Sequence, residues 1–114
     1  MSTAKSSPLV DVAWLAANID DPRVRVVDVR WYLSGKRGAD EYLQGHLPEA
    51  SFVDLDRDLA APPGAGPGRH PLPSAAAFAR VLAYIGVTRG TIVVAYDDAG
   101  GAIAARFWWL LRWF

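Results

Sequence analysis

Carboxylates and two histidines are the side chains best suited to chemistry in this sequence, because it contains no cysteine. The absence of cysteine excludes disulfides, thiolate metal sites and cysteine nucleophiles. Asp97 and Asp98 follow a run of β-branched and aromatic residues and precede a segment that favours helix. A carboxylate there is stabilised by the helix dipole and by unpaired backbone N–H groups. We interpret the pair as a cap and loop brace. The alternative, an aspartyl nucleophile, lacks an evident second acid and lysine.

Two other patterns resemble ligand sites but have the wrong residues at decisive positions. An acidic triplet opens like a calcium loop and comprises Asp54, Asp56 and Asp58. Leu59 and Ala65 stand where that loop needs a glycine and a bidentate acid. The glycine-rich stretch 64–68 follows no strand and lacks the lysine and Ser/Thr of a phosphate loop. Neither pattern predicts a bound ion or nucleotide.

The two histidines, His46 and His70, are too few for a metal cluster without help from carboxylates. His46 lies in the turn Gly45-His46-Leu47-Pro48, where a structural hydrogen bond is the default expectation. We therefore expect no metal and no cofactor in this chain.

Apolar segments of two kinds alternate along the chain and must position these side chains. Strands are expected at 9–10, 24–29, 51–55 and 91–96, and helices at 13–18, 39–43, 74–85 and 102–114. The alternation predicts an α/β fold with a parallel sheet. Because 91–96 shows no polar alternation, we expect that strand to be covered on both faces. The loop 97–101 then lies at the carboxyl end of a strand, where ligands gather in open α/β sheets.

The last helix carries more apolar surface than one core-facing stripe needs, with three of the five tryptophans in 102–114. We expect it to be buried nearly all round or to meet another domain. Arg106 and Arg112 point to different faces of this helix, so one can brace the Asp97 loop while the other reaches solvent or a partner. The stretch 61–73, with five prolines and three glycines, predicts an irregular surface loop.

Composition limits the class of protein. The 114 residues fit a single domain, and 52% are apolar, which argues against general disorder. Twelve basic and twelve acidic residues give no electrostatic case for nucleic acid or an anionic membrane. Residues 1–8 lack the apolar run of a signal peptide and are expected to be a flexible N-terminus. We expect a soluble, cytoplasmic protein.

Five stretches together resemble the rhodanese family, and specifically the amino-terminal domain of two-domain sulfurtransferases. They are Val26–Tyr32, Glu41–Ala50, Phe52–Asp56, Val93–Asp97 and Ala105–Arg112. The resemblance covers 9–114 in the family's order and spacing. It implies a rhodanese-like three-layer fold, with a central, mainly parallel sheet flanked by helices.

The resemblance also implies that Asp97 replaces the cysteine of an active rhodanese domain. Such a cysteine carries a persulfide within a ring of backbone N–H groups, and a carboxylate cannot do this chemistry. Trp31 and Tyr32 match positions that, in such proteins, help to wall the active site at the domain interface. Ala102 and Ile103 occupy the place where that wall usually has a larger residue. The implied loop and brace residues are Asp98, Gly100, Gly101 and Arg106.

Relatives continue past the tryptophan-rich helix into one more strand and a cysteine-bearing second domain. We therefore expect a domain that is truncated on its C-terminal side and lacks its last strand. By this resemblance the chain is the non-catalytic half of a thiosulfate or 3-mercaptopyruvate sulfurtransferase, inactive alone, with the second domain as partner in cis. The acceptor would be cyanide or a thiol. The alternative is a freestanding, catalytically inactive rhodanese-like module that binds a protein.

Overall fold

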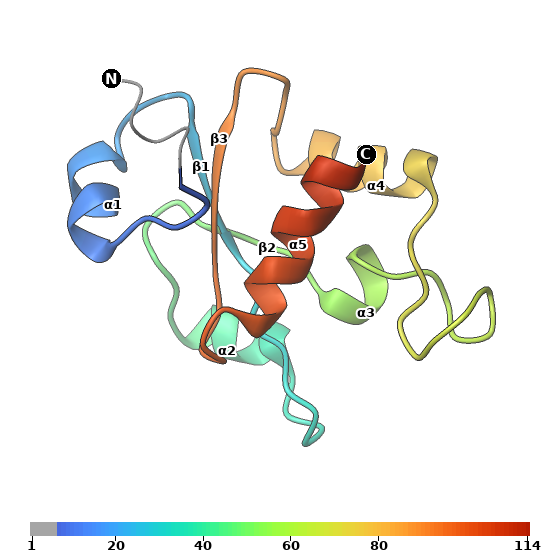
Figure 1. Cartoon of the computed structure of the whole chain (residues 1–114). Helices are drawn as coiled ribbons and strands as arrows, with labels where there is room; N and C mark the ends of the chain where they lie inside the picture. Colours follow the sequence, from blue (N-terminus) through green and yellow to red (C-terminus); the bar gives the residue numbers. More distant parts are fainter. Residues whose placement is uncertain (1–6) are drawn as a thin grey trace.

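The computed structural model describes residues 7–114, so most of the expected flexible segment 1–8 lies outside the described residues. Helices and strands alternate along the chain (Figure 1). The strands are β1 (Val24–Asp28), β2 (Ser51–Phe52) and β3 (Ile92–Tyr96). The helices are α1 (Val12–Asn18), α2 (Gly38–Gln44), α3 (Leu55–Asp58), α4 (Ala75–Tyr84) and α5 (Ala102–Trp113).

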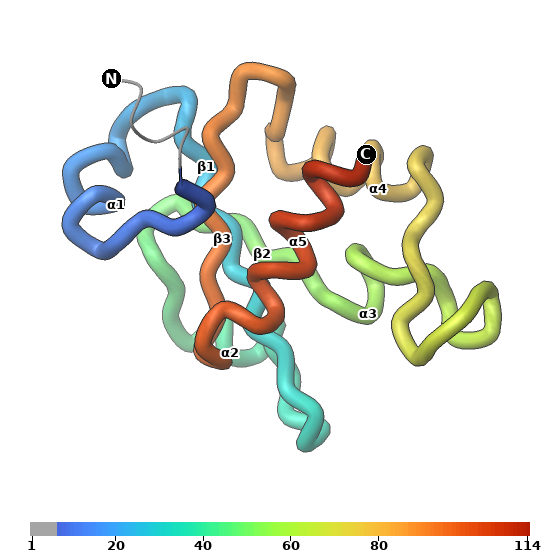
Figure 2. The backbone as a smooth tube through the Cα atoms, viewed as in Figure 1, coloured from blue at the N-terminus to red at the C-terminus, as the bar shows by residue number. Residues whose placement is uncertain are grey.

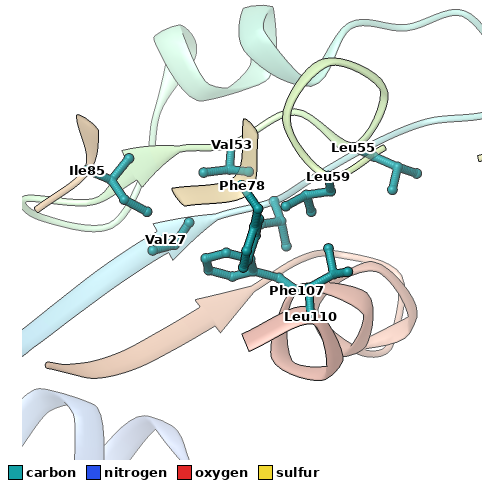
Figure 3. Packing of buried hydrophobic residues seen from close by; sticks show 9 residues of the cluster. Val27, Val53, Leu55, Leu59, Phe78, Ile85, Phe107 and Leu110 are labelled. Atoms are coloured by element: carbon teal, nitrogen blue, oxygen red, sulfur yellow. The ribbon is translucent and has the colours of Figure 1, made fainter. Parts of the chain in front are cut away.

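The three strands form one parallel sheet in the order β2-β1-β3. Residues along β1 alternate between two apolar clusters, because successive side chains of a strand point to opposite faces. The larger cluster gathers Val27 and Val29 with α3, α4 and α5, and includes Phe78, Phe107 and Leu110 (Figure 3). The smaller one packs Val24 and Val26 against α1 and α2. The predicted α/β fold, with a parallel sheet between helix layers, is confirmed.

Helix starts follow the capping residues in the sequence. Asp11 accepts the N–H of Trp14 and begins α1, and Ser74 accepts the N–H of Ala77 and begins α4. Asp54 accepts two backbone N–H groups and begins α3. The strand expected at 51–55 is therefore wrong in length, because the chain leaves the sheet after two residues to enter this helix. Residues 9–10 form no strand.

The third strand packs against apolar clusters on both faces, as predicted, but its coverage is incomplete. Every residue of β3 is partly exposed, whereas β1 is largely buried, because β1 lies in the centre of the sheet and β3 at its edge. The last helix is likewise only half covered. Phe107 and Leu110 are fully buried, while four aromatic residues are exposed: Trp108, Trp109, Trp113 and Phe114.

Residues 60–73 form the irregular loop that the proline content predicted, and Figure 2 shows it extending beside α3. Its middle is exposed, but Pro71 and Pro73 near its end are buried. Within residues 7–114, no helix combines the length and apolar character that crossing a bilayer requires.

Candidate functional site

The loop after β3 is shaped by two glycines. Gly100 and Gly101 have φ values of 69° and 94°, in the left-handed region that residues with a Cβ disfavour. Gly101 is the N-cap of α5 and has no side chain with which to cap it. The first turn of this helix must therefore find its hydrogen-bond acceptor elsewhere.

Asp97 supplies that acceptor and receives four backbone hydrogen bonds. Its Oδ1 accepts from the N–H groups of Ala99 at 2.9 Å and Gly101 at 2.8 Å. Its Oδ2 accepts from Ile103 and Ala104, both at 2.8 Å. A carboxylate offers about four lone-pair positions, and all of them are used here. The predicted capping is confirmed, and no lone pair is left for the attack that an aspartyl nucleophile must make.

The same hydrogen bonds set the charge state of the loop. Burial raises the pKa of Asp97, but the four backbone donors outweigh burial and hold the pKa below its ordinary value of 3.8. At neutral pH the loop thus encloses a fixed negative charge at the positive end of the α5 dipole. The ring of amide hydrogens is filled by the chain itself.

Asp98 links this loop to the segment after β1. The hydroxyl of Tyr32 donates to Asp98 Oδ2 at 2.6 Å, and this bond raises the pKa of Tyr32 to about 12. The ammonium of Lys36 lies 4.7 Å from the centre of the Tyr32 ring. The segments that follow two neighbouring strands are therefore joined at the carboxyl edge of the sheet.

The two predicted wall residues of α5 have different surroundings. Ala102 is exposed in the first turn of the helix, on the side of the loop. Ile103 is partly buried, because it packs against the larger core cluster. Trp31 and Tyr32 are also partly buried and stand beyond the end of β1.

A second polar group surrounds Trp31, and the sequence reasoning did not find it. The indole Nε1–H of Trp31 donates to Asp56 Oδ2 at 2.8 Å. The imidazole Nε2–H of His70 donates to Asp56 Oδ1 at 2.7 Å, and the His70 ring meets the Trp31 ring edge-on, with centroids 5.5 Å apart. The Trp31 bond, followed by the His70 bond, lowers the pKa of Asp56 against the effect of burial. We call Trp31, Asp56 and His70 the Trp–Asp–His group.

The carboxylate fixes which nitrogen of His70 carries the proton. With Nε2–H bound to Asp56, a neutral ring keeps the lone pair on Nδ1 free to accept a proton. An aspartate that orients a histidine in this way is a common acid–base arrangement. No sequence pattern indicated this group, because His70 follows Asp56 by 14 residues, across the irregular loop 60–73. The spacing of Asp54, Asp56 and Asp58 resembles the start of a calcium loop and does not indicate that Asp56 has a separate role.

The three acidic residues of that triplet indeed do different work. Asp54 caps α3, and Asp58 pairs with Arg57 at 2.7 Å and accepts the N–H of Asp54. Only Asp56 belongs to the Trp–Asp–His group. The residues that resemble the start of a calcium loop thus have three separate local roles.

The expectation that Arg106 braces the Asp97 loop needs correction. Its guanidinium donates to the carbonyls of Leu59 at 2.9 Å, His70 at 3.0 Å and Pro71 at 3.4 Å, which belong to the proline-rich loop. Arg106 lies just over one turn into α5, on the side of the helix that contacts the proline-rich loop. Arg112 lies over the ring of Trp108, 5.3 Å from the ring centroid.

His46 has the structural role that its turn predicted. Its Nδ1–H donates to the carbonyl of Tyr42 at 2.7 Å, and its ring stacks on the Tyr42 ring.

Asp28 is fully buried and accepts from Arg30 at 2.7 Å and from the hydroxyl of Tyr96 at 2.9 Å. This network ties the ends of β1 and β3 together beneath the surface loops.

Comparison with known proteins agrees with this architecture. Residues 11–114 match the family model described as a rhodanese-like domain. The chain is 46% identical over 110 residues to a Pseudomonas aeruginosa protein named "Probable 3-mercaptopyruvate sulfurtransferase", covering 95% of this chain and 39% of that protein. It is 41% identical to the thiosulfate sulfurtransferase of Bos taurus, covering 93% of this chain and 37% of that one.

A solved structure gives the same result. The 3-mercaptopyruvate sulfurtransferase from Leishmania major superposes with a TM-score of 0.82 at 31% identity, over 90% of this chain and 28% of that one. The chain thus spans under two fifths of the length of the curated relatives quoted above. The sequence match and the shared three-layer architecture lead to one conclusion: this chain belongs to the rhodanese family.

Proposed function

We propose that the chain is the non-catalytic half of a sulfurtransferase, which moves sulfane sulfur from thiosulfate or 3-mercaptopyruvate to cyanide or a thiol. The observation that carries the proposal is the filled ring of amide hydrogens around Asp97. Sulfur relay needs a thiolate that attacks the donor and holds the sulfur as a persulfide. A carboxylate in that ring stabilises the loop and leaves no room for the relay. The cysteine then belongs to a second domain of the same polypeptide.

This half would contribute to the joined protein a surface at the carboxyl edge of the sheet, where the second domain would dock. Trp31 and Tyr32 supply its aromatic wall, and Ala102 and Ile103 adjoin it from α5. The Tyr32–Asp98 bond holds the two sides of the face together. In the joined protein, this face would form one side of a substrate pocket whose other side belongs to the second domain.

The Trp–Asp–His group gives this face acid–base capacity. The His70 side chain is 21% exposed, and Asp56 holds its ring in place. In the joined protein, His70 can accept a proton from a group on the second domain or from the substrate, and return it later. The second domain supplies the sulfur-carrying thiolate.

The test uses the purified chain with thiosulfate and cyanide. We expect no thiocyanate above the uncatalysed rate, because no side chain here can hold sulfane sulfur. The same chain is then mixed with an isolated cysteine-bearing rhodanese domain, and the indole Nε1–H signals are followed by NMR. The Trp31 signal should shift, whereas that of Trp113 on α5 should not. Thiocyanate formed by the chain alone would refute the proposal.

A second candidate function is a freestanding module that binds a protein. The observation that favours it is the exposed aromatic surface of α5, where Trp109 and Trp113 stack with centroids 5.3 Å apart and are 42% and 60% exposed. Exposed aromatic clusters of this kind often mark interaction sites. In the same NMR experiment, this function predicts that the Trp113 signal shifts with a partner while Trp31 stays in place.

A further inference from the structure

Arg106 is a partly buried arginine whose guanidinium has only carbonyl partners. Within residues 7–114 it forms no ion pair, and its donors go to the main chain of Leu59, His70 and Pro71. Burial without a carboxylate lowers its pKa. Desolvating a cation is costly, and here three main-chain carbonyls are the groups that offset the cost.

The three carbonyls lie at the two ends of the proline-rich loop. Leu59 is fully buried at its start, and Pro71 is buried at its end. The N–H of Ala61 also donates to the carbonyl of Pro71 at 2.9 Å, so the two ends meet. Arg106 thus closes the base of the loop from outside, while residues 62–69 remain exposed.

His70 connects this clamp to the Trp–Asp–His group. Its carbonyl accepts from Arg106, and its ring donates to Asp56 and contacts Trp31. The main chain of His70 is therefore fixed by α5, and its side chain is fixed by α3 and by the segment after β1. Without the clamp, the base of this glycine-rich loop keeps the Ala61–Pro71 hydrogen bond but loses the three bonds from α5, so the main chain that carries the imidazole is held less firmly.

We propose that Arg106 is a positioning residue that sets the location of the His70 imidazole by holding the main chain of the proline-rich loop. The planar guanidinium reaches both ends of the loop with Nε and Nη2 at once, which the single ammonium of lysine cannot do in the same geometry. The importance of this position for sulfur transfer rests on the proposed function. The placement of the ring is a property of the chain alone.

The test compares Arg106→Met and Arg106→Lys with a matched control, Arg112→Met, on the exposed side of the same helix. The chain has two histidines, so the ring signals of His70 can be followed by NMR with His46 as an internal reference. In Arg106→Met we expect the His70 ring and Trp31 indole signals to move toward those of unstructured residues, while His46 stays unchanged. Arg106→Lys should give a partial shift, and Arg112→Met none.

Limited trypsin digestion gives a second measurement. Arg69 lies in the exposed part of the loop, next to His70. Loss of the clamp should raise cleavage after Arg69 on the order of tenfold in Arg106→Met, because local opening becomes easier by the free energy of the lost hydrogen bonds. Cleavage after Arg37, which lies in another loop, should not change.

Three outcomes would overturn the proposal. The first is a folded Arg106→Met whose His70 signals and cleavage match those of the unsubstituted chain. The second is an equal shift of His46 and His70. The third is unfolding of both Arg106 variants, which would assign the residue to the fold as a whole. None of these needs a second domain, so failure of the proposed function would leave the result for Arg106 intact.

Discussion

The loops that follow two neighbouring parallel strands, β1 and β3, have opposite characters. The loop after β3 turns its polar groups inward, and both oxygens of Asp97 are used by the chain's own amide hydrogens. Beside the segment after β1 the polar groups face outward, because the exposed Asp56 of α3 binds both the Trp31 indole and the His70 ring. The position at which rhodanese chemistry is expected is thus closed, and the position beside it is open. In this chain, the exposed Asp56 and the partly exposed His70 lie outside the loop after β3.

The largest loss of stability is expected when the carboxylate of Asp97 is removed from the loop after β3. Asp97→Ala removes the acceptor of four N–H groups, and we expect it to lower the free energy of unfolding by about 2–4 kcal/mol. Asp97→Asn keeps one acceptor oxygen and should lose about half as much. Urea denaturation measures both. A loss under ~0.5 kcal/mol for Asp97→Ala would show that the carboxylate does not hold the loop.

The pH dependence of the unsubstituted chain gives a related check. The folded pKa of Asp97 lies below its unfolded value near 3.8. Its stabilisation is therefore fully present above the unfolded pKa and is lost as pH falls through the folded pKa. Asp97→Asn should flatten this part of the curve of stability against pH.

A smaller effect is expected from the backbone of the same loop. Gly101→Ala places a Cβ at a φ of 94° and should cost about 1–2 kcal/mol, because the left-handed conformation is strained for alanine. Gly90→Ala is the matched control, since a Cβ there meets open space and its φ lies outside that region. Equal stability of the two variants, measured by thermal unfolding, would contradict a loop shaped by glycine.

Removing the Tyr32–Asp98 hydrogen bond, which links the two regions, should lower the free energy of unfolding by a still smaller amount. Tyr32→Phe removes the hydrogen bond to Asp98 and should cost under ~1 kcal/mol, because the pair is partly exposed. The pKa of Tyr32 is raised to about 12, so the bond contributes fully below the unfolded value of 10.0 and is lost as pH rises toward 12. Hydrogen exchange in the Asp97 loop should stay slow in the variant. Fast exchange there would mean that the two regions form one unit.

The smallest change in stability is expected in the open region. Asp56→Ala should alter the free energy of unfolding by no more than ~0.5 kcal/mol, since the Asp56 side chain is 62% exposed. The NMR signals of the Trp31 indole and the His70 ring should nevertheless shift, because both lose their acceptor. Asp40→Ala, on exposed α2, should leave those signals in place. Unchanged signals in Asp56→Ala would contradict the Trp–Asp–His group.

Local patterns in the sequence were sufficient for the fold class and for the capping role of Asp97. Alternating apolar segments, the caps Asp11 and Ser74 and the glycines after β3 act over a few residues, so they can be recognised without a structure. The partial exposure of β3 was not predictable in this way. Apolar composition does not reveal whether a strand lies in the centre or at the edge of a sheet.

The open region could not be predicted because its parts meet only in three dimensions. Asp56 and His70 are separated by a loop with no periodicity, and Trp31 comes from a third segment. Arg106 was expected near Asp97 on account of their nearness in sequence. Just over one turn of helix carries its side chain to the proline-rich loop instead. Rotation along α5, and not sequence distance, decides which loop it holds.

We propose that this chain carries no sulfane sulfur, because the ring of amide hydrogens that could hold a sulfur nucleophile is filled by Asp97. Intact mass spectrometry of the purified chain, after incubation with thiosulfate or with 3-mercaptopyruvate, tests this directly. We expect a single species of unchanged mass under both conditions. A species heavier by one sulfur atom, removed again by cyanide, would contradict it.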